Sequence, residues 1–158
     1  MHTKLWALAA LSLAAAILTG VAAANPAAAQ QRIAIQGQRT AAGRDAGVLI
    51  PLTSGALGRD SGTLTGCCWT ERSVVRDGQS IEINDPLLTF TLKQGTFVTR
   101  NRVEWIDVGN GYVNGIHTWK IVHVTGDYAH LVGHGRGAVV GLPNGALKWR
   151  FEGLVGPR

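Results

Sequence analysis

The sequence predicts an all-β protein, folded as an antiparallel β-barrel of about eight strands. From Gly62 onward, short runs of alternating apolar and polar residues are separated by turn residues, as in half-buried strands joined by hairpins. Asp77-Gly78 and Asn110-Gly111 are strong signals for two-residue hairpins. No convincing helical stripe follows residue 30. Closing the barrel would also remove the exposed edges of so many strands.

The same alternation places the individual strands. In the run Leu88–Leu92, apolar side chains share one face and threonines take the other, which fits a strand that lines a core. Residues 126–131 are the one segment that fits a single helical turn, and Pro143-Asn-Gly145 predicts a tight turn. We expect strands over residues 63–70, 73–76, 80–84, 88–92, 96–108, 112–116, 119–124, 137–142 and 148–152.

Residues 1–29 are predicted to be a signal peptide. Lys4 gives a short positive region, a long apolar run follows, and Ala27 and Ala29 occupy the small-x-small positions of a signal-peptidase site. We place cleavage after Ala29. The sequence therefore predicts a protein that is secreted or periplasmic after cleavage.

Two alternatives to this cleavage remain open. The bond between Ala24 and Asn25 is a second candidate for cleavage, and the run is long enough for an uncleaved membrane anchor. Since no second apolar run follows, we expect no stable membrane insertion after cleavage. No Cys lies near the site, which excludes lipoprotein processing.

The remainder divides into two parts by composition. Residues 30–60 are rich in Gly, Ala, Arg and Gln and predict a flexible segment with one strand, at residues 48–52. Residues 61–158 are predicted to form the barrel domain. The net charge of +5 comes mostly from scattered arginines. A nucleic-acid-binding protein would instead concentrate its cations in a stripe with interleaved aromatics, so we expect no nucleic-acid partner.

The two cysteines, Cys67 and Cys68, are adjacent. Neighbouring residues on a strand point to opposite faces, and a bond between them needs a strained ring. We therefore expect one buried and one exposed thiol, or an intermolecular bond, with a vicinal disulfide as the minor alternative. No Cys-x-x-Cys is present to support a zinc-ribbon or thioredoxin-like role.

The stretch DYAHLVGHGRG, residues 127–137, raises the question of a metal or phosphate site. His130 and His134 would lie about 13 Å apart on an extended strand, too far for one metal ion, and His123 is a third ligand only through folding that the sequence does not show. The glycines at 133, 135 and 137 precede a strand and a turn rather than a helix, so they do not form a dinucleotide loop. They are better explained as places where another segment packs closely.

The sequence offers no catalytic constellation. It has no Gly-x-Ser-x-Gly, and a cysteine nucleophile has no local support. Asp107, beside Trp105 on one strand face, and Glu71 are candidates for a buried acid, although a surface position is the more common one. Catalytic residues are therefore unknown, and no cofactor and no metal is expected.

Several segments resemble one barrel family. Thr118-Trp-Lys-Ile-Val122 is followed by Thr125-Gly-Asp-Tyr-Ala129-x-Leu-x-Gly-x-Gly135, and a looser likeness runs from residue 88 to Gly153. This pattern is similar to that of small secreted bacterial proteins with the allene oxide cyclase barrel, which dirigent proteins share. The resemblance implies an eight-stranded barrel with a cavity, in which residues 127–137 are a corner and the start of a strand. It implies no active site, because the cyclase's catalytic positions do not match this chain residue by residue.

Three functions are consistent with the sequence. The first is an exported, non-catalytic barrel that binds a small apolar ligand, with Trp69, Trp105, Trp119 and Trp149 either lining the cavity or filling the core. The second is an isomerase or cyclase that acts on a lipid-like substrate. The third is an oligomerising surface or structural module, with a homo-oligomer as the partner.

Overall fold

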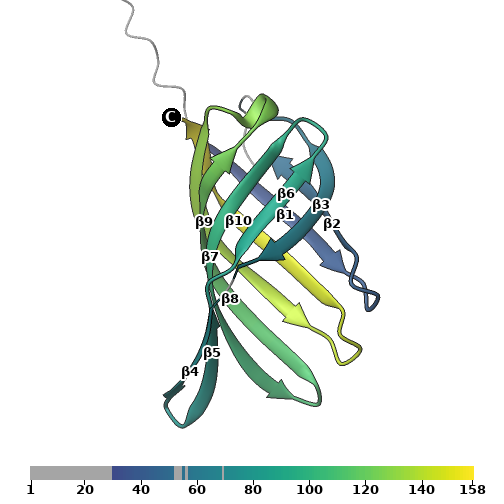
Figure 1. The fold of residues 1–158 in the computed structure, drawn as a ribbon, viewed down its shortest axis with the longest axis vertical. Coiled ribbons are helices and arrows are strands. Elements are labelled where there is room, and N and C mark those ends of the chain that lie inside the picture. The colour runs from purple at the N-terminus through teal and green to yellow at the C-terminus, as the bar shows by residue number, and fades with distance from the viewer. Residues whose placement is uncertain (1–29, 52–54, 56, 69) are drawn as a thin grey trace, which may run out of the picture.

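The chain folds into a closed antiparallel β-barrel in the structure, a computed structural model that describes residues 30–51, 55, 57–68 and 70–158 (Figure 1). The strands and the single 3₁₀ turn of this part are β1 (Gln31–Arg39), β2 (Asp45–Pro51), β3 (Asp60–Cys67), β4 (Glu71–Arg76), β5 (Gln79–Asn84), β6 (Leu87–Leu92), β7 (Thr96–Gly109), β8 (Tyr112–Val124), η1 (Gly126–Tyr128), β9 (Leu131–Gly141) and β10 (Leu147–Pro157). The predicted all-β class and eight-stranded barrel are confirmed.

The barrel closes with eight strand paths because two paths are interrupted. β3 and β4 follow one another along one path, and β5 and β6 along the next. β6 pairs with the first part of β7 and β5 with a later part, while β8 pairs along the other edge of β7. β9, β10, β1 and β2 complete the circle back to β3. The β4–β5 hairpin projects at the lower end in Figure 1.

Two hairpin turns follow directly from their residue types. Asp77 and Gly78 have φ of 52° and 77°, and Asn110 and Gly111 have φ of 55° and 78°. Positive φ at both central residues is the type I′ geometry, whose twist matches that of the flanking strands. Asn and Asp tolerate this region better than other side chains, and Gly adopts it freely. Both predicted hairpins are therefore confirmed.

Residues 30–60 were predicted to be flexible with one strand at 48–52. β2 covers most of that strand, but β1 was not predicted, and both are integral strands of the barrel. β1 pairs with β10 along one edge and with β2 along the other. Ile33 and Ile35 are 2% and 1% exposed. The ring of Trp149, from β10, occupies the space that a side chain at position 37 would need, so Gly37 fits there. The barrel therefore begins at Gln31. The sequence did not indicate this strand because one of its partners, β10, is remote in the chain.

Two strands are also longer than the sequence suggests. β8 runs without a break through the two strands predicted at 112–116 and 119–124, and β9 begins at Leu131 rather than at residue 137. Residues 126–128 form the single turn that was predicted, so DYAHLVGHGRG is indeed a corner and a strand start. Two of its glycines, Gly135 and Gly137, leave room for the rings of Trp119 and His117. A side chain at Gly135 would collide with Trp119 and with the backbone of β10.

The core of the barrel contains a cluster of aromatic rings that pack against one another. Phe90 contacts Phe97 with ring centroids 4.7 Å apart, and Phe151 packs edge-on against Phe90 at 5.4 Å. Edge-to-face pairs of this kind are favourable because the ring edge is positive and the ring face negative. Trp119 and Trp149, predicted as core or cavity residues, are 3% and 7% exposed. Trp69 lies outside the described residues.

One end of the barrel is closed by a buried polar pair. The Tyr128 hydroxyl of η1 donates to Asp60 Oδ2 at 2.7 Å, and the backbone N–H groups of Gln94 and Lys93 donate to the same carboxylate at 3.0 and 3.3 Å. Burial alone would raise the pKa of Asp60, but these hydrogen bonds outweigh it and lower that pKa. The pair ties η1 and the β6–β7 turn to the start of β3.

The predicted signal peptide, with Lys4, Ala27 and Ala29, lies outside the described residues, as do its alternatives. Within the described part of the chain, no helix is long and apolar enough to cross a membrane.

Candidate functional site

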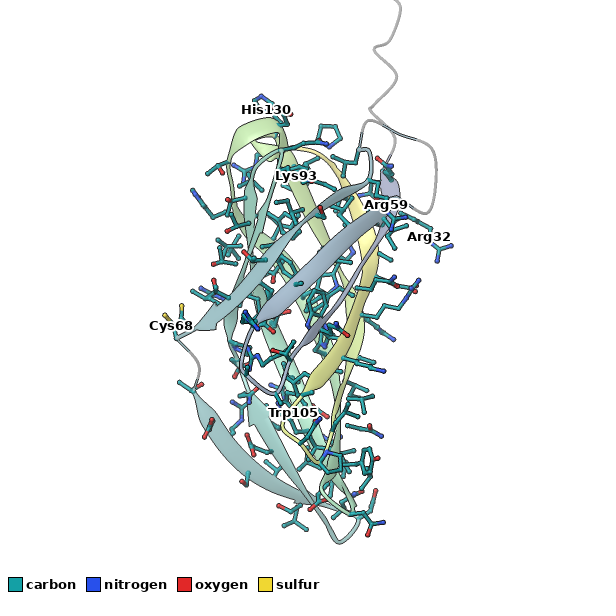
Figure 2. The ribbon with its side chains drawn as sticks, turned by 90° about the vertical axis from the view of Figure 1, so that its right-hand side faces the viewer. Arg32, Arg59, Cys68, Lys93, Trp105 and His130 are labelled. Atoms are coloured by element: carbon teal, nitrogen blue, oxygen red, sulfur yellow. The ribbon has the colours of Figure 1, made fainter. Side chains whose placement is uncertain are left out.

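The open half of the barrel contains a cavity of about 240 Å³. Trp105, which lines it, lies toward the end opposite His130 and Lys93 in Figure 2. The inner walls are mainly apolar and come from strands on opposite sides of the barrel. They include Leu64, Leu88, Val103, Trp105, His117, Val139, Trp149 and Phe151. The prediction of a barrel with an internal cavity thus fits this half, while aromatic rings fill the other.

His117 is the titratable side chain of the inner wall. It lies on β8, paired with Val103 of β7 and with Gly137 of β9. Its ring centroid is 4.2 Å from that of Phe151, and the residue is 6% exposed. A side chain at position 137 would collide with the imidazole, so Gly137 makes room for it. Burial lowers the pKa of His117 to about 4, which keeps it neutral at pH 7.

Two ring nitrogens of this wall have no hydrogen-bond partner in the structure. They are His117 Nε2 and Trp149 Nε1, both buried. By contrast, Trp105 Nε1 donates to Asn84 Oδ1 at 3.2 Å, so that tryptophan is satisfied within the wall. A buried polar atom without a partner costs about 1–3 kcal/mol, so each such atom calls for an explanation, of which a bound ligand or an ordered water is one.

Charged groups stand at the mouth of the cavity. Arg39, at the end of β1, donates from Nε and Nη2 to both oxygens of Asp45 on β2, with distances of 2.9–3.1 Å. Glu71, at the start of β4, also lines the cavity. The mouth therefore combines one fixed ion pair with a further carboxylate, above an apolar interior.

A second depression is larger but is an open surface groove. It measures about 910 Å³ and lies over β1, β2, β3 and β10, between polar side chains such as Gln36, Gln38 and Arg150. His117, whose Nε2 is buried without a partner, lines the inner cavity and not this groove, whereas Trp149 lines both. The inner cavity is therefore the better candidate for a specific site.

The histidines singled out in the sequence do not form a site. His123, His130 and His134 are exposed. In the residues that the structure places, no group of three His, Cys, Asp or Glu side chains is arranged to hold a metal ion.

The acids singled out in the sequence are exposed as well. Asp107 accepts a hydrogen bond from the backbone N–H of Gly109 at 2.8 Å and lies near the β7–β8 turn. Glu71 is exposed but reaches the cavity mouth, as described above. Among the residues that the structure describes, Asp60 is a buried acid, and the sequence analysis did not single it out because it stands outside any clear strand pattern.

The prediction for the cysteines was wrong in one respect. Both Cys67 and Cys68 are exposed and unbonded, rather than one buried and one exposed. The physical reason is that the strand ends at Cys67, so the alternation of faces does not extend to Cys68.

His117 was missed by the sequence analysis, although a signal for it exists. It stands two residues before Trp119, on the same face of one strand, so the alternation that makes Trp119 a core residue also places His117 inside. Dividing residues 112–124 into two strands concealed that signal.

Comparison of the chain with family models, with curated proteins and with solved structures gives no match in any of the three. The likeness to the allene oxide cyclase barrel therefore stays a prediction.

Proposed function

We propose that this protein is a small barrel that binds an apolar ligand with one uncharged hydrogen-bonding group. The observation that carries the proposal is that His117 and Trp149 line a cavity with a mainly apolar inner wall, and that each has a buried ring nitrogen without a hydrogen-bond partner. Ligand sites are commonly apolar pockets with a few polar groups that fix orientation. A hydroxyl or carbonyl group of a ligand would provide the hydrogen-bond partner that such a nitrogen lacks in the protein.

The size and charge of the cavity narrow the ligand class. A volume of about 240 Å³ equals that of about eight water molecules in the liquid, which suits one ring with a short substituent. A neutral imidazole and an indole N–H would not compensate the desolvation of a charged group. We therefore favour a neutral ligand over a carboxylate or an amine.

A series of three probes of similar size tests this proposal. Toluene, benzyl alcohol and benzoate share one ring and differ in having no polar group, a neutral hydroxyl or a charge. We expect benzyl alcohol to bind severalfold tighter than toluene, since a net hydrogen bond contributes about 1 kcal/mol, and benzoate to bind weakest. Chemical-shift titration of the His117 and Trp149 ring signals measures this. Equal binding of all three, or shifts confined to the surface, would contradict the proposal.

An isomerase or cyclase is the second candidate. Neutral His117 inside, with Asp45 and Glu71 at the mouth, places a base and carboxylates around one cavity. The cavity of about 240 Å³ fits a small substrate better than a long lipid-like one. Incubating the protein with lipid-like epoxides would decide, because an enzyme converts them and loses that activity in His117→Phe, whereas a binding protein leaves them unchanged.

Export and self-association are further parts of the proposal. If the chain is cleaved after Ala29, protein recovered from outside the cytoplasm should have the intact mass of a chain that starts at Gln30. Ile116 and Val140, on the outer face of β8 and β9, are 60% and 38% exposed, an apolar surface that favours a homo-oligomer. A monomer in size-exclusion chromatography with light scattering would argue against the oligomer.

A further inference from the structure

Cys67 and Cys68 lie where the path from β3 to β4 is interrupted. Strand pairing with the neighbouring path ends at Cys67, which faces Leu87, and resumes at Glu71, which faces Asn84. The facing path is interrupted at the same level, between β5 and β6. Because the two cysteines stand at the end of a ladder, the backbone at Cys68 can change conformation without breaking pairs inside a strand.

The backbone turns both thiols to the same side. Cys68 has φ of 59°, in the left-handed region that few side chains other than Asn and Asp adopt. Figure 2 shows the two sulfur atoms, in yellow, side by side at the surface beside the label of Cys68. A hydrogen bond between the two side chains raises the pKa of Cys67, as expected for thiols that lie close together. Both residues are exposed.

We propose that Cys67 and Cys68 form a thiol–disulfide exchange site, which takes small organic disulfides as oxidant and closes to a vicinal disulfide. The thiolate of one cysteine attacks a sulfur of the organic disulfide, whose S–S bond breaks and releases one thiolate. The second cysteine, after losing its proton, attacks the protein sulfur of this mixed disulfide and releases the other thiolate. The protein thereby loses two electrons and two protons, and the organic disulfide is reduced to two thiols.

The closed form is expected to be easily reduced. Adjacent Cα atoms are about 3.8 Å apart across a trans peptide, which is shorter than the usual range of about 4.4–6.8 Å for disulfides. The resulting strain makes such a bond labile, and labile, exposed disulfides belong to the regulatory or catalytic class. The pair is therefore suited to cycling between two states rather than to stabilising the fold.

The test uses the full chain, reduced and then incubated with an excess of oxidised glutathione. Intact mass spectrometry after acid quenching should show a transient glutathione adduct that gives way to a chain lighter by two hydrogen atoms. Cys67→Ser and Cys68→Ser each keep a single thiol and should accumulate a stable adduct. Thermal melting checks that the reduced variants are folded. The melting temperature of each variant should equal that of the reduced wild type, because both side chains are exposed.

Two results would overturn the proposal. One is a wild-type chain that keeps stable adducts, as the serine variants do, which would show that the thiols do not react with each other. The other is the accumulation of covalent dimers alone, which would show that the sulfurs pair between chains.

Discussion

Acidification should destabilise this protein through His117 before its carboxylates begin to titrate. The unfolded chain takes up a proton on this histidine near pH 6.5, whereas in the folded protein burial lowers its pKa to about 4. Between these values the unfolded state binds more protons than the folded state, so acid favours unfolding. The stabilising contribution is complete above the unfolded pKa and is lost as the pH falls toward 4.

The expected loss can be worked out from these two values. One pKa unit corresponds to about 1.4 kcal/mol, and linkage between pKa values of 6.5 and about 4 gives a loss of about 2 kcal/mol between pH 7 and pH 5. The pKa of Asp60 is shifted in the same direction as that of His117, but from a lower starting value. Its pKa is lowered from 3.8, so its contribution is lost only below the window in question.

Urea denaturation at several pH values, on wild type and His117→Phe, measures this effect. Phenylalanine keeps a ring beside Phe151 and removes the titrating group, while the exposed histidines remain in both proteins. We expect the free energy of unfolding of wild type to fall by about 2 kcal/mol more than that of the variant between pH 7 and pH 5. A difference between the two proteins that does not change with pH would refute the reasoning, because His117 would then titrate equally in both states.

Two further predictions concern the packing. Tyr128→Phe removes the hydroxyl that donates to the buried Asp60. Urea denaturation should show that this lowers the free energy of unfolding by about 1–3 kcal/mol. An unchanged free energy would mean that this hydrogen bond does not stabilise the closed end of the barrel. Gly135→Ala should cost about 1–3 kcal/mol because the added methyl group meets Trp119 and the β10 backbone, whereas Gly58→Ala, with open space around it, should stay within about 0.5 kcal/mol. Equal thermal stability of these two variants would contradict the steric role of Gly135.

The parts of the fold that the sequence predicted are those with local causes. Asp77-Gly78 and Asn110-Gly111 specify their turns through the conformations that their own residues adopt. The steric interpretation of Gly135 is confirmed, although the sequence did not identify the ring of Trp119 as the group that fills the space.

The parts that escaped prediction depend on distant partners. β1 carries few strong strand formers, and it is ordered by β10, more than a hundred residues away in the chain. Asp60 and Tyr128 meet across 68 positions, so neither residue's local sequence indicates the other. The cavity is likewise a product of strands from opposite sides of the barrel. Only His117 could have been found earlier, by counting in twos from Trp119.

The central claim, that the inner cavity is a ligand site, is tested most directly by filling it. Val139 and Val140 are neighbours on β9, but Val139 lines the cavity and Val140 is exposed on the outer face. Val139→Phe should abolish the chemical-shift changes that benzyl alcohol causes at the His117 and Trp149 rings, while Val140→Phe, the same substitution on the other face, should leave them as in wild type. Circular dichroism confirms that both variants are folded. Undiminished binding by folded Val139→Phe would contradict the account, because the ligand would then lie outside the cavity.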